Sequence, residues 1–182
     1  TLVSKVRFTA TPVHGYERIF QTSNALQASN DDIQILRSGT GNMIEIWVGE
    51  GSTYCNKADI PFEQNTWYTI VFRYVTESKL MSLELNGIRY EKVCDSNFIV
   101  TDRTNRNNFI GKGSWSSNDL FNGDMAGLYV WDRYLNDIEV ASVTQGIHIN
   151  EKDDLHPDTC MENCPSGTYR NTVFHGAVIS QD

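Results

Sequence analysis

The chain has 182 residues, 40% of them hydrophobic and 11% aromatic, which is enough for one large core but not for two. Lysine and arginine number 15 against 23 aspartates and glutamates, and the net charge of -8 would repel a nucleic-acid backbone. The densest basic stretch, residues 103–112, is flanked by Asp102 and Asp119, so we expect no nucleic-acid partner.

No apolar run approaches the roughly 20 residues that cross a bilayer, so we expect no direct insertion into a membrane. The first residues, Thr1 to Lys5, contain neither a starting methionine nor an apolar leader. We therefore expect the chain to be part of a longer, multidomain protein.

Alternation with a period of two predicts strands along most of the first 131 residues. In the segment 42–48, for example, Ile44 and Val48 share one face with Ile46, opposite Glu45 and Trp47. The expected strands, in chain order, are 5–10, 33–36, 42–48, 67–75, 81–85, 88–93, 109–111 and 125–131.

The segment 67–75 is apolar or aromatic at nearly every position, which predicts a strand covered on both faces. Asn86 and Gly87 tolerate positive φ angles, so they predict a tight hairpin. After residue 135 the period changes, and Asn136 with Glu139 forms the capping box of one short helix. Its apolar contacts are expected from Ile138, Val140, Ala141 and Val143.

Many short strands, one late helix and no alternating strand–helix units predict an all-β, antiparallel sandwich with one short C-terminal helix. From about residue 150 the pattern disappears, and a charged linker leads to a small cysteine-containing tail with almost no core, which cannot fold by burial alone. We therefore predict a domain at 1–149, followed by a linker and tail at 150–182.

Three segments resemble, in order and spacing, the concanavalin A-like jelly rolls of the laminin G and pentraxin superfamily: Asn65–Tyr74, Leu83–Gly87 and Phe121–Leu135. The resemblance implies a jelly-roll sandwich over roughly residues 1–147, with Trp67 anchoring the core. It also implies a non-catalytic, lectin-like recognition or adhesion module that binds a glycan or an extracellular protein. The binding surface would be formed by loops at one rim of the sandwich, with a structural spacer as the alternative.

The segment Cys160–Asn171 resembles the start of a cysteine-rich repeat of the ephrin-receptor-like type. Such repeats occur in large cell-surface proteins, so this resemblance implies an extracellular or cell-surface location. It further implies that Cys160 and Cys164 have partners beyond residue 182.

The cysteines lack the spacing of a zinc site and are expected to form disulfide bonds, which belong to an oxidising compartment. Cys55 and Cys94 flank the predicted central hairpin and are the favoured pair. Four cysteines, including Cys160 and Cys164, allow three connectivities, so the other pairings stay open.

The resemblance to pentraxins also implies a calcium site, because a hard cation requires several oxygen ligands. Asn30, Asp31 and Asp32 precede the strand 33–36 in the matching place. The second acidic cluster of pentraxins is missing, and only Asn118 and Asp119 would compensate for it. A solvated turn is the alternative role of these residues.

Aromatic residues in loops are the candidates for ligand contact, because their rings stack on sugars or anchor proteins. These are Trp115, Tyr54 and Phe121. A glycoside hydrolase is the distant alternative: Glu45 and Glu50 have a suitable spacing, but Trp47 occupies the place of the middle carboxylate. We expect the chain not to be an enzyme.

Overall fold

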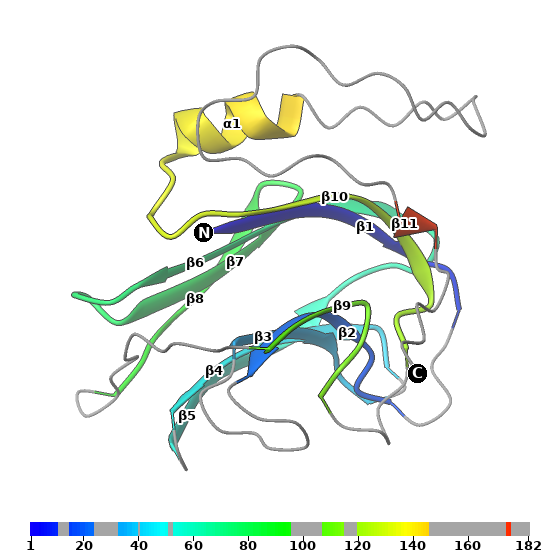
Figure 1. Ribbon diagram of the computed structural model, residues 1–182, viewed down its shortest axis with the longest axis horizontal. Helices are drawn as coiled ribbons and strands as arrows, with labels where there is room; N and C mark the ends of the chain where they lie inside the picture. Colours follow the sequence, from blue (N-terminus) through cyan, green and yellow to red (C-terminus); the bar gives the residue numbers. More distant parts are fainter. Residues whose placement is uncertain are drawn as a thin grey trace.

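The computed structural model describes residues 1–10, 15–23, 33–39, 41–50, 53–95, 107–114, 120–145 and 174–175. Two sheets pack face to face, and a short helix lies outside one of them (Figure 1). The elements are β1 (Leu2–Phe8), β2 (Arg18–Ser23), β3 (Ile33–Arg37), β4 (Met43–Glu50), β5 (Thr53–Pro61), β6 (Trp67–Val75), β7 (Leu80–Leu85), β8 (Ile88–Val93), β9 (Asn107–Ile110), β10 (Gly123–Val130), α1 (Asp137–Gln145) and β11 (Phe174–His175).

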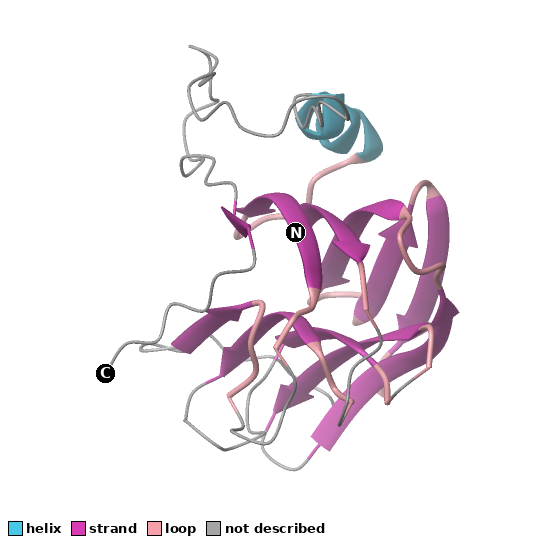
Figure 2. Ribbon diagram, turned by 90° about the vertical axis from the view of Figure 1, so that its right-hand side faces the viewer, coloured by secondary structure: helices cyan, strands magenta, loops and turns pink. Residues whose placement is uncertain are grey.

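The six-stranded sheet A has the order β11-β10-β1-β6-β7-β8, and the five-stranded sheet B has the order β5-β4-β3-β2-β9. Every paired neighbour among the described strands is antiparallel. Figure 2 shows the two layers from the side, with α1 beyond sheet A. The architecture confirms the expected all-β sandwich of the jelly-roll type.

The main core fills the space between the sheets, and strand alternation decides which side chains enter it. Ile44, Ile46 and Val48 of β4 are fully buried there, whereas Glu45 and Trp47 lie on the opposite face and are half-buried. The predicted division of β4 into two faces is therefore confirmed.

A smaller apolar cluster lies on the outer face of sheet A beneath α1. Val3 and Val71 pack there against Leu135 and Val140. Because α1 covers this part of the sheet, β6 is buried on both faces in its middle, as its continuous apolar sequence predicted.

Helix α1 begins as predicted but docks more loosely than expected. The Glu139 N–H donates to Asn136 Oδ1 at 3.0 Å and the Asn136 N–H donates to Glu139 Oε2 at 2.9 Å, which is the predicted capping box. Ile138, however, is 80% exposed, so the expectation that it packs on the sheet is wrong. Val140 is the buried residue of the helix, and Val143, three residues later, is partly buried against the same cluster.

Charged groups hold the start of α1 to sheet A. The buried Arg73 guanidinium donates to Asp137 Oδ1 at 2.8 Å and to the Leu135 carbonyl at 3.1 Å. No helix in the described part of the chain is long and apolar enough to cross a membrane.

The predicted hairpin and disulfide are both present. Asn86 and Gly87 have φ angles of 49° and 86° in the turn between β7 and β8. Cys55 of β5 is bonded to Cys94, which directly follows β8, with Cα atoms 5.5 Å apart. The bridge joins an edge strand of sheet B to an edge strand of sheet A, so it closes one side of the sandwich.

Trp67 is placed differently from the expectation that it anchors the core. It is half-buried on the outer face of sheet A, where the Arg7 guanidinium lies 4.9 Å from its ring centroid. Arg7 also forms an ion pair with Asp124 of β10 at 2.6 Å. Because Val6 and Phe8 point into the core, Arg7 and its cross-strand neighbour Trp67 must point outward.

Candidate functional site

The aromatic residues proposed as ligand contacts do not form one rim. Tyr54 lies near the start of β5, opposite Gly49 of β4. Phe121 lies near the other end of sheet B, where its ring is 5.2 Å from that of Phe8 and packs against the main core. Trp115 lies outside the described residues. Tyr54 and Phe121 are therefore separated by most of the length of β5.

The proposed calcium ligands Asn30, Asp31, Asp32, Asn118 and Asp119 also lie outside the described residues. Within the part of the chain that the structure describes, no three His, Cys, Asp or Glu side chains are grouped so as to hold a metal ion. Cys160 and Cys164, in the predicted tail, also lie outside the described residues.

Much of the outer face of sheet B is covered. Gln21 and Gln34 point outward from the central strands β2 and β3, yet they are 0% and 4% exposed. The Gln21 amide group is held by Ser114, with two hydrogen bonds of 2.9 Å. Ser114 thus lies against Gln21 on the outer face of β2, and the outward side chains of β4 and β5 are less buried than Gln21 and Gln34.

The half-buried side chains on the outer side of β4 and β5 are Glu45, Trp47, Tyr54 and Asn56, which we call the aromatic–amide face. Trp47 lies directly opposite Asn56, and Tyr54 is its diagonal neighbour. Cys55 points into the core to form the disulfide, so the residues on either side of it must point outward.

Hydrogen bonds fix the aromatic–amide face. The Trp47 indole N–H donates to Glu45 Oε2 at 2.7 Å, and the Ser38 hydroxyl donates to the other oxygen of the same carboxylate. The ring centroids of Trp47 and Tyr54 are 5.5 Å apart with the rings edge to face, an arrangement favoured by aromatic quadrupoles.

Gly49 makes room for the Tyr54 ring. A Cβ atom at Gly49 would lie 2.2 Å from that ring, which is far inside van der Waals contact. The glycine thus allows the ring to lie across β4 and meet Trp47. The Tyr54 hydroxyl is buried and has no hydrogen-bond partner among the described residues.

This arrangement offers apolar ring surfaces beside an amide and an oriented carboxylate. Such a combination is suited to a ligand that carries both C–H and hydroxyl groups. The outward position of Glu45 and Trp47 followed from the alternation of β4. The contribution of Asn56 was missed, because β5 was not predicted as a strand.

The family model of the concanavalin A-like lectin/glucanases superfamily, of laminin G type, matches residues 6–141. No curated protein matches the sequence. Among solved structures, the chain is similar to the Ruminococcus gnavus IT-sialidase CBM40 bound to alpha2,3 sialyllactose, with a TM-score of 0.60 and 14% identity. The similarity covers 79% of this chain and 80% of that one, and at this identity it shows the fold alone.

Proposed function

The chain belongs to the concanavalin A-like lectin/glucanases superfamily, and on this premise we propose that it is a non-catalytic carbohydrate-binding module. Its ligand would lie on the aromatic–amide face of sheet B. The ligand of the similar sialidase module is a sugar, which supports carbohydrate as the ligand class for this chain.

The observation that carries the proposal is the Trp47–Tyr54 pair on the outer side of β4 and β5. The C–H face of a sugar ring loses water when it packs on an aromatic ring, which is favourable. Its hydroxyl groups would exchange hydrogen bonds with the Asn56 amide and the Glu45 carboxylate beside the rings. The fixed orientation of Trp47 reduces the entropy lost on binding.

We propose that the face binds without hydrolysis. A glycosidase of the usual kind requires two carboxyl groups about 5–10 Å apart, one of them protonated. Both oxygens of Glu45 accept hydrogen bonds from protein groups, which supports a role for this carboxylate in positioning Trp47. The protein should release no product from 4-nitrophenyl glycosides; measurable release that disappears in Glu45→Gln would contradict the non-catalytic assignment.

Binding to a glycan array, followed by titration calorimetry with the strongest ligand, tests the proposal. Trp47→Ala should weaken binding about tenfold or more, which corresponds to at least about 1.4 kcal/mol. The matched control is Trp67→Ala, which removes another half-buried tryptophan from the opposite sheet and should leave affinity unchanged. Equal losses in the two variants, or no loss in either, would remove the aromatic–amide face as the site.

An extracellular or cell-surface location and a place in a longer multidomain chain complete the proposal. The Cys55–Cys94 disulfide supports the location, because such bonds persist mainly in oxidising compartments. Recovery of the tagged full-length protein from culture medium would test this location.

We also propose that calcium bound by the Asn30–Asp32 segment assists ligand binding. If no glycan binds, an extracellular protein is the next ligand to test.

A further inference from the structure

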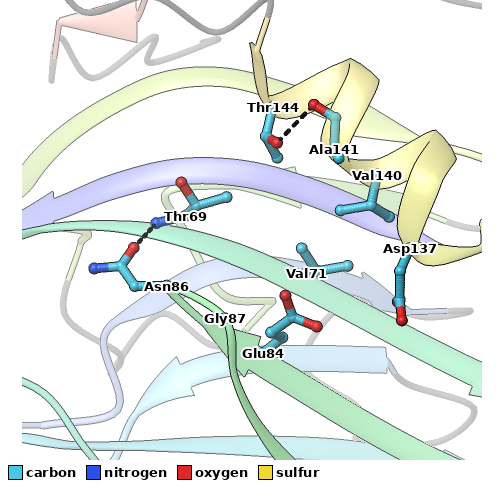
Figure 3. Close-up of a pocket in the computed structure, with 9 residues that line it drawn as sticks. All are labelled: Thr69, Val71, Glu84, Asn86, Gly87, Asp137, Val140, Ala141 and Thr144. Atoms are coloured by element: carbon cyan, nitrogen blue, oxygen red, sulfur yellow. Dashed lines mark hydrogen bonds between the residues drawn. The ribbon is translucent and has the colours of Figure 1, made fainter.

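A groove of about 280 Å³ lies between α1 and the outer face of sheet A (Figure 3). One wall is formed by the helix, through Val140, Ala141 and Thr144, and the floor by Thr69 and Val71 of β6. The groove is on the opposite side of the sandwich from the aromatic–amide face, because it adjoins sheet A and α1 (Figure 1).

The lining of the groove changes character along its length. Val71, Val140 and Ala141 give it an apolar middle. Figure 3 shows Thr69 with Asn86 toward one end and Asp137 toward the other. A ligand that fits must therefore offer apolar surface between polar groups.

The charges at the acidic end of the groove cancel. Glu84 Oε2 accepts from Arg73 at 3.4 Å and from Arg89 at 3.1 Å, and Asp137 Oδ1 accepts from the same two residues at 2.8 and 2.6 Å. Two carboxylates thus meet two guanidinium groups, so the site has no net charge to attract an ion. Within the described residues, the second oxygen of each carboxylate has no hydrogen-bond donor, so both are free to accept from a ligand hydroxyl.

We propose that this groove is a second, separate binding site for a neutral, polyhydroxylated ligand of about the size of one sugar ring. The volume lies near the lower limit of small-molecule pockets, so the groove itself holds about one sugar ring. Sugar C–H groups would pack on Val71 and Val140, and hydroxyls would donate to the free oxygens of Glu84 and Asp137. A charged ligand would have to compete with the existing ion pairs.

The proposal goes beyond binding at the aromatic–amide face, because the two sites lie on different sheets. Two sites on opposite sides of one module would let it bridge two glycan units or two chains, with a gain in avidity. A free monosaccharide and a residue within an oligosaccharide offer the same chemistry to the groove. The experiment must therefore compare both sources.

Two-dimensional ¹H–¹⁵N NMR of the full chain tests the proposal with glucose, galactose, mannose, N-acetylglucosamine and lactose as probes. Each is added up to about 50 mM, which substantially fills a site with a millimolar Kd. We expect at least one probe to shift the amide signals of Gly87 and Thr144. Shifts with lactose alone would identify an oligosaccharide residue as the source, and shifts with a free sugar would identify a monosaccharide.

Two substitutions on α1 provide the matched comparison. Ala141→Phe fills the groove and should reduce the affinity of the active probe about tenfold or more. Ser142→Phe adds the same ring at an exposed neighbouring position outside the lining and should leave the affinity unchanged. Thr144→Ala removes a lining hydroxyl that donates to the Ala141 carbonyl of its own helix at 3.1 Å, so it provides a milder test if Ala141→Phe fails to fold.

The groove is rejected if no probe moves the signals of Gly87 and Thr144, or if their shifts persist unchanged in Ala141→Phe and Thr144→Ala. The Trp47 indole N–H signal reports separately on the aromatic–amide face. The side-chain amide signal of Asn56, which lies opposite Trp47, reports on the same face and is still present in Trp47→Ala. Loss of the Asn56 response in Trp47→Ala with the groove signals retained would show that the two sites are independent. The two sets of signals therefore allow the groove and the aromatic–amide face to be confirmed or rejected separately.

Discussion

Removal of the Cys55–Cys94 disulfide should strongly destabilise the domain. The bridge spans 39 residues of sequence, and the loop-entropy model gives about 4 kcal/mol at 25 °C for a loop of this length. Both cysteines are buried, at 3% and 4% exposure, so alanine at these positions also leaves small unfilled volumes in the core. Since domains of this size are stable by about 5–15 kcal/mol, the loss would be a large fraction of the total.

Urea unfolding of the Cys55→Ala/Cys94→Ala variant, followed by tryptophan fluorescence, measures this loss. The midpoint should fall, and the m-value should rise because the unfolded chain without the bridge is more expanded. A control variant with Cys160→Ala and Cys164→Ala removes the same number of cysteines from the tail. A destabilisation below about 1 kcal/mol would refute the entropic argument and would mean that the unfolded chain is already compact.

The remaining predictions concern single features of the structure. Gly49→Ala should displace the Tyr54 ring and cost about 1–3 kcal/mol in thermal melting, but much less in a Tyr54→Ala background, and equal costs would exclude the clash. The pKa of Asp137 is lowered from its ordinary value of 3.8, chiefly by a hydrogen bond from Arg89, so its contribution to stability is present above that value and is lost as the pH falls through the folded-state pKa. Asp137→Asn should flatten the acid part of the pH–stability curve, and an unchanged curve would contradict the pairing. Calcium should raise the melting temperature and a chelator should reverse the effect; identical melts would remove calcium from the proposed function.

The features that could be predicted from the sequence are those fixed by local physics. Because successive side chains of a strand point to opposite faces, Ile46 and Trp47 of β4 must lie on different faces of the sheet, independently of tertiary contacts. The turn at Asn86 and Gly87 needs positive φ at both positions, and few residue pairs supply it. The capping box of Asn136 is likewise a local exchange of hydrogen bonds.

Strand β5 could not be predicted because its state depends on its partners. It contains Asn56, Lys57 and Asp59, residues that favour loops, and Asp59 has a φ of 61°. Its pairing with β4 shifts register between Ile44 and Ile46, which hides the alternation. Without β5, Tyr54 could be recognised only as a loop aromatic.

Errors at Trp67 and Ile138 have a related cause. The sequence of an apolar strand does not show on which face of the sheet its first tryptophan lies, because that depends on the register with β1. Ile138 fits a helical apolar stripe, but the contacts of α1 with the cluster on sheet A come from Val140 and Val143, so Ile138 stays exposed. In both places a tertiary contact decides burial, and the local pattern does not contain it.

The same dependence of β5 on its partners ties the stability of the module to its proposed binding. β5 is an edge strand held by β4 on one side and by the disulfide through Cys55. Tyr54 and Asn56 lie on either side of that cysteine, so any freedom gained by Cys55 moves the two β5 residues of the aromatic–amide face relative to Glu45 and Trp47 on β4. Reduction of the bridge should therefore weaken glycan binding even under conditions in which the domain remains folded, because the edge strand would have to be ordered again when the ligand binds.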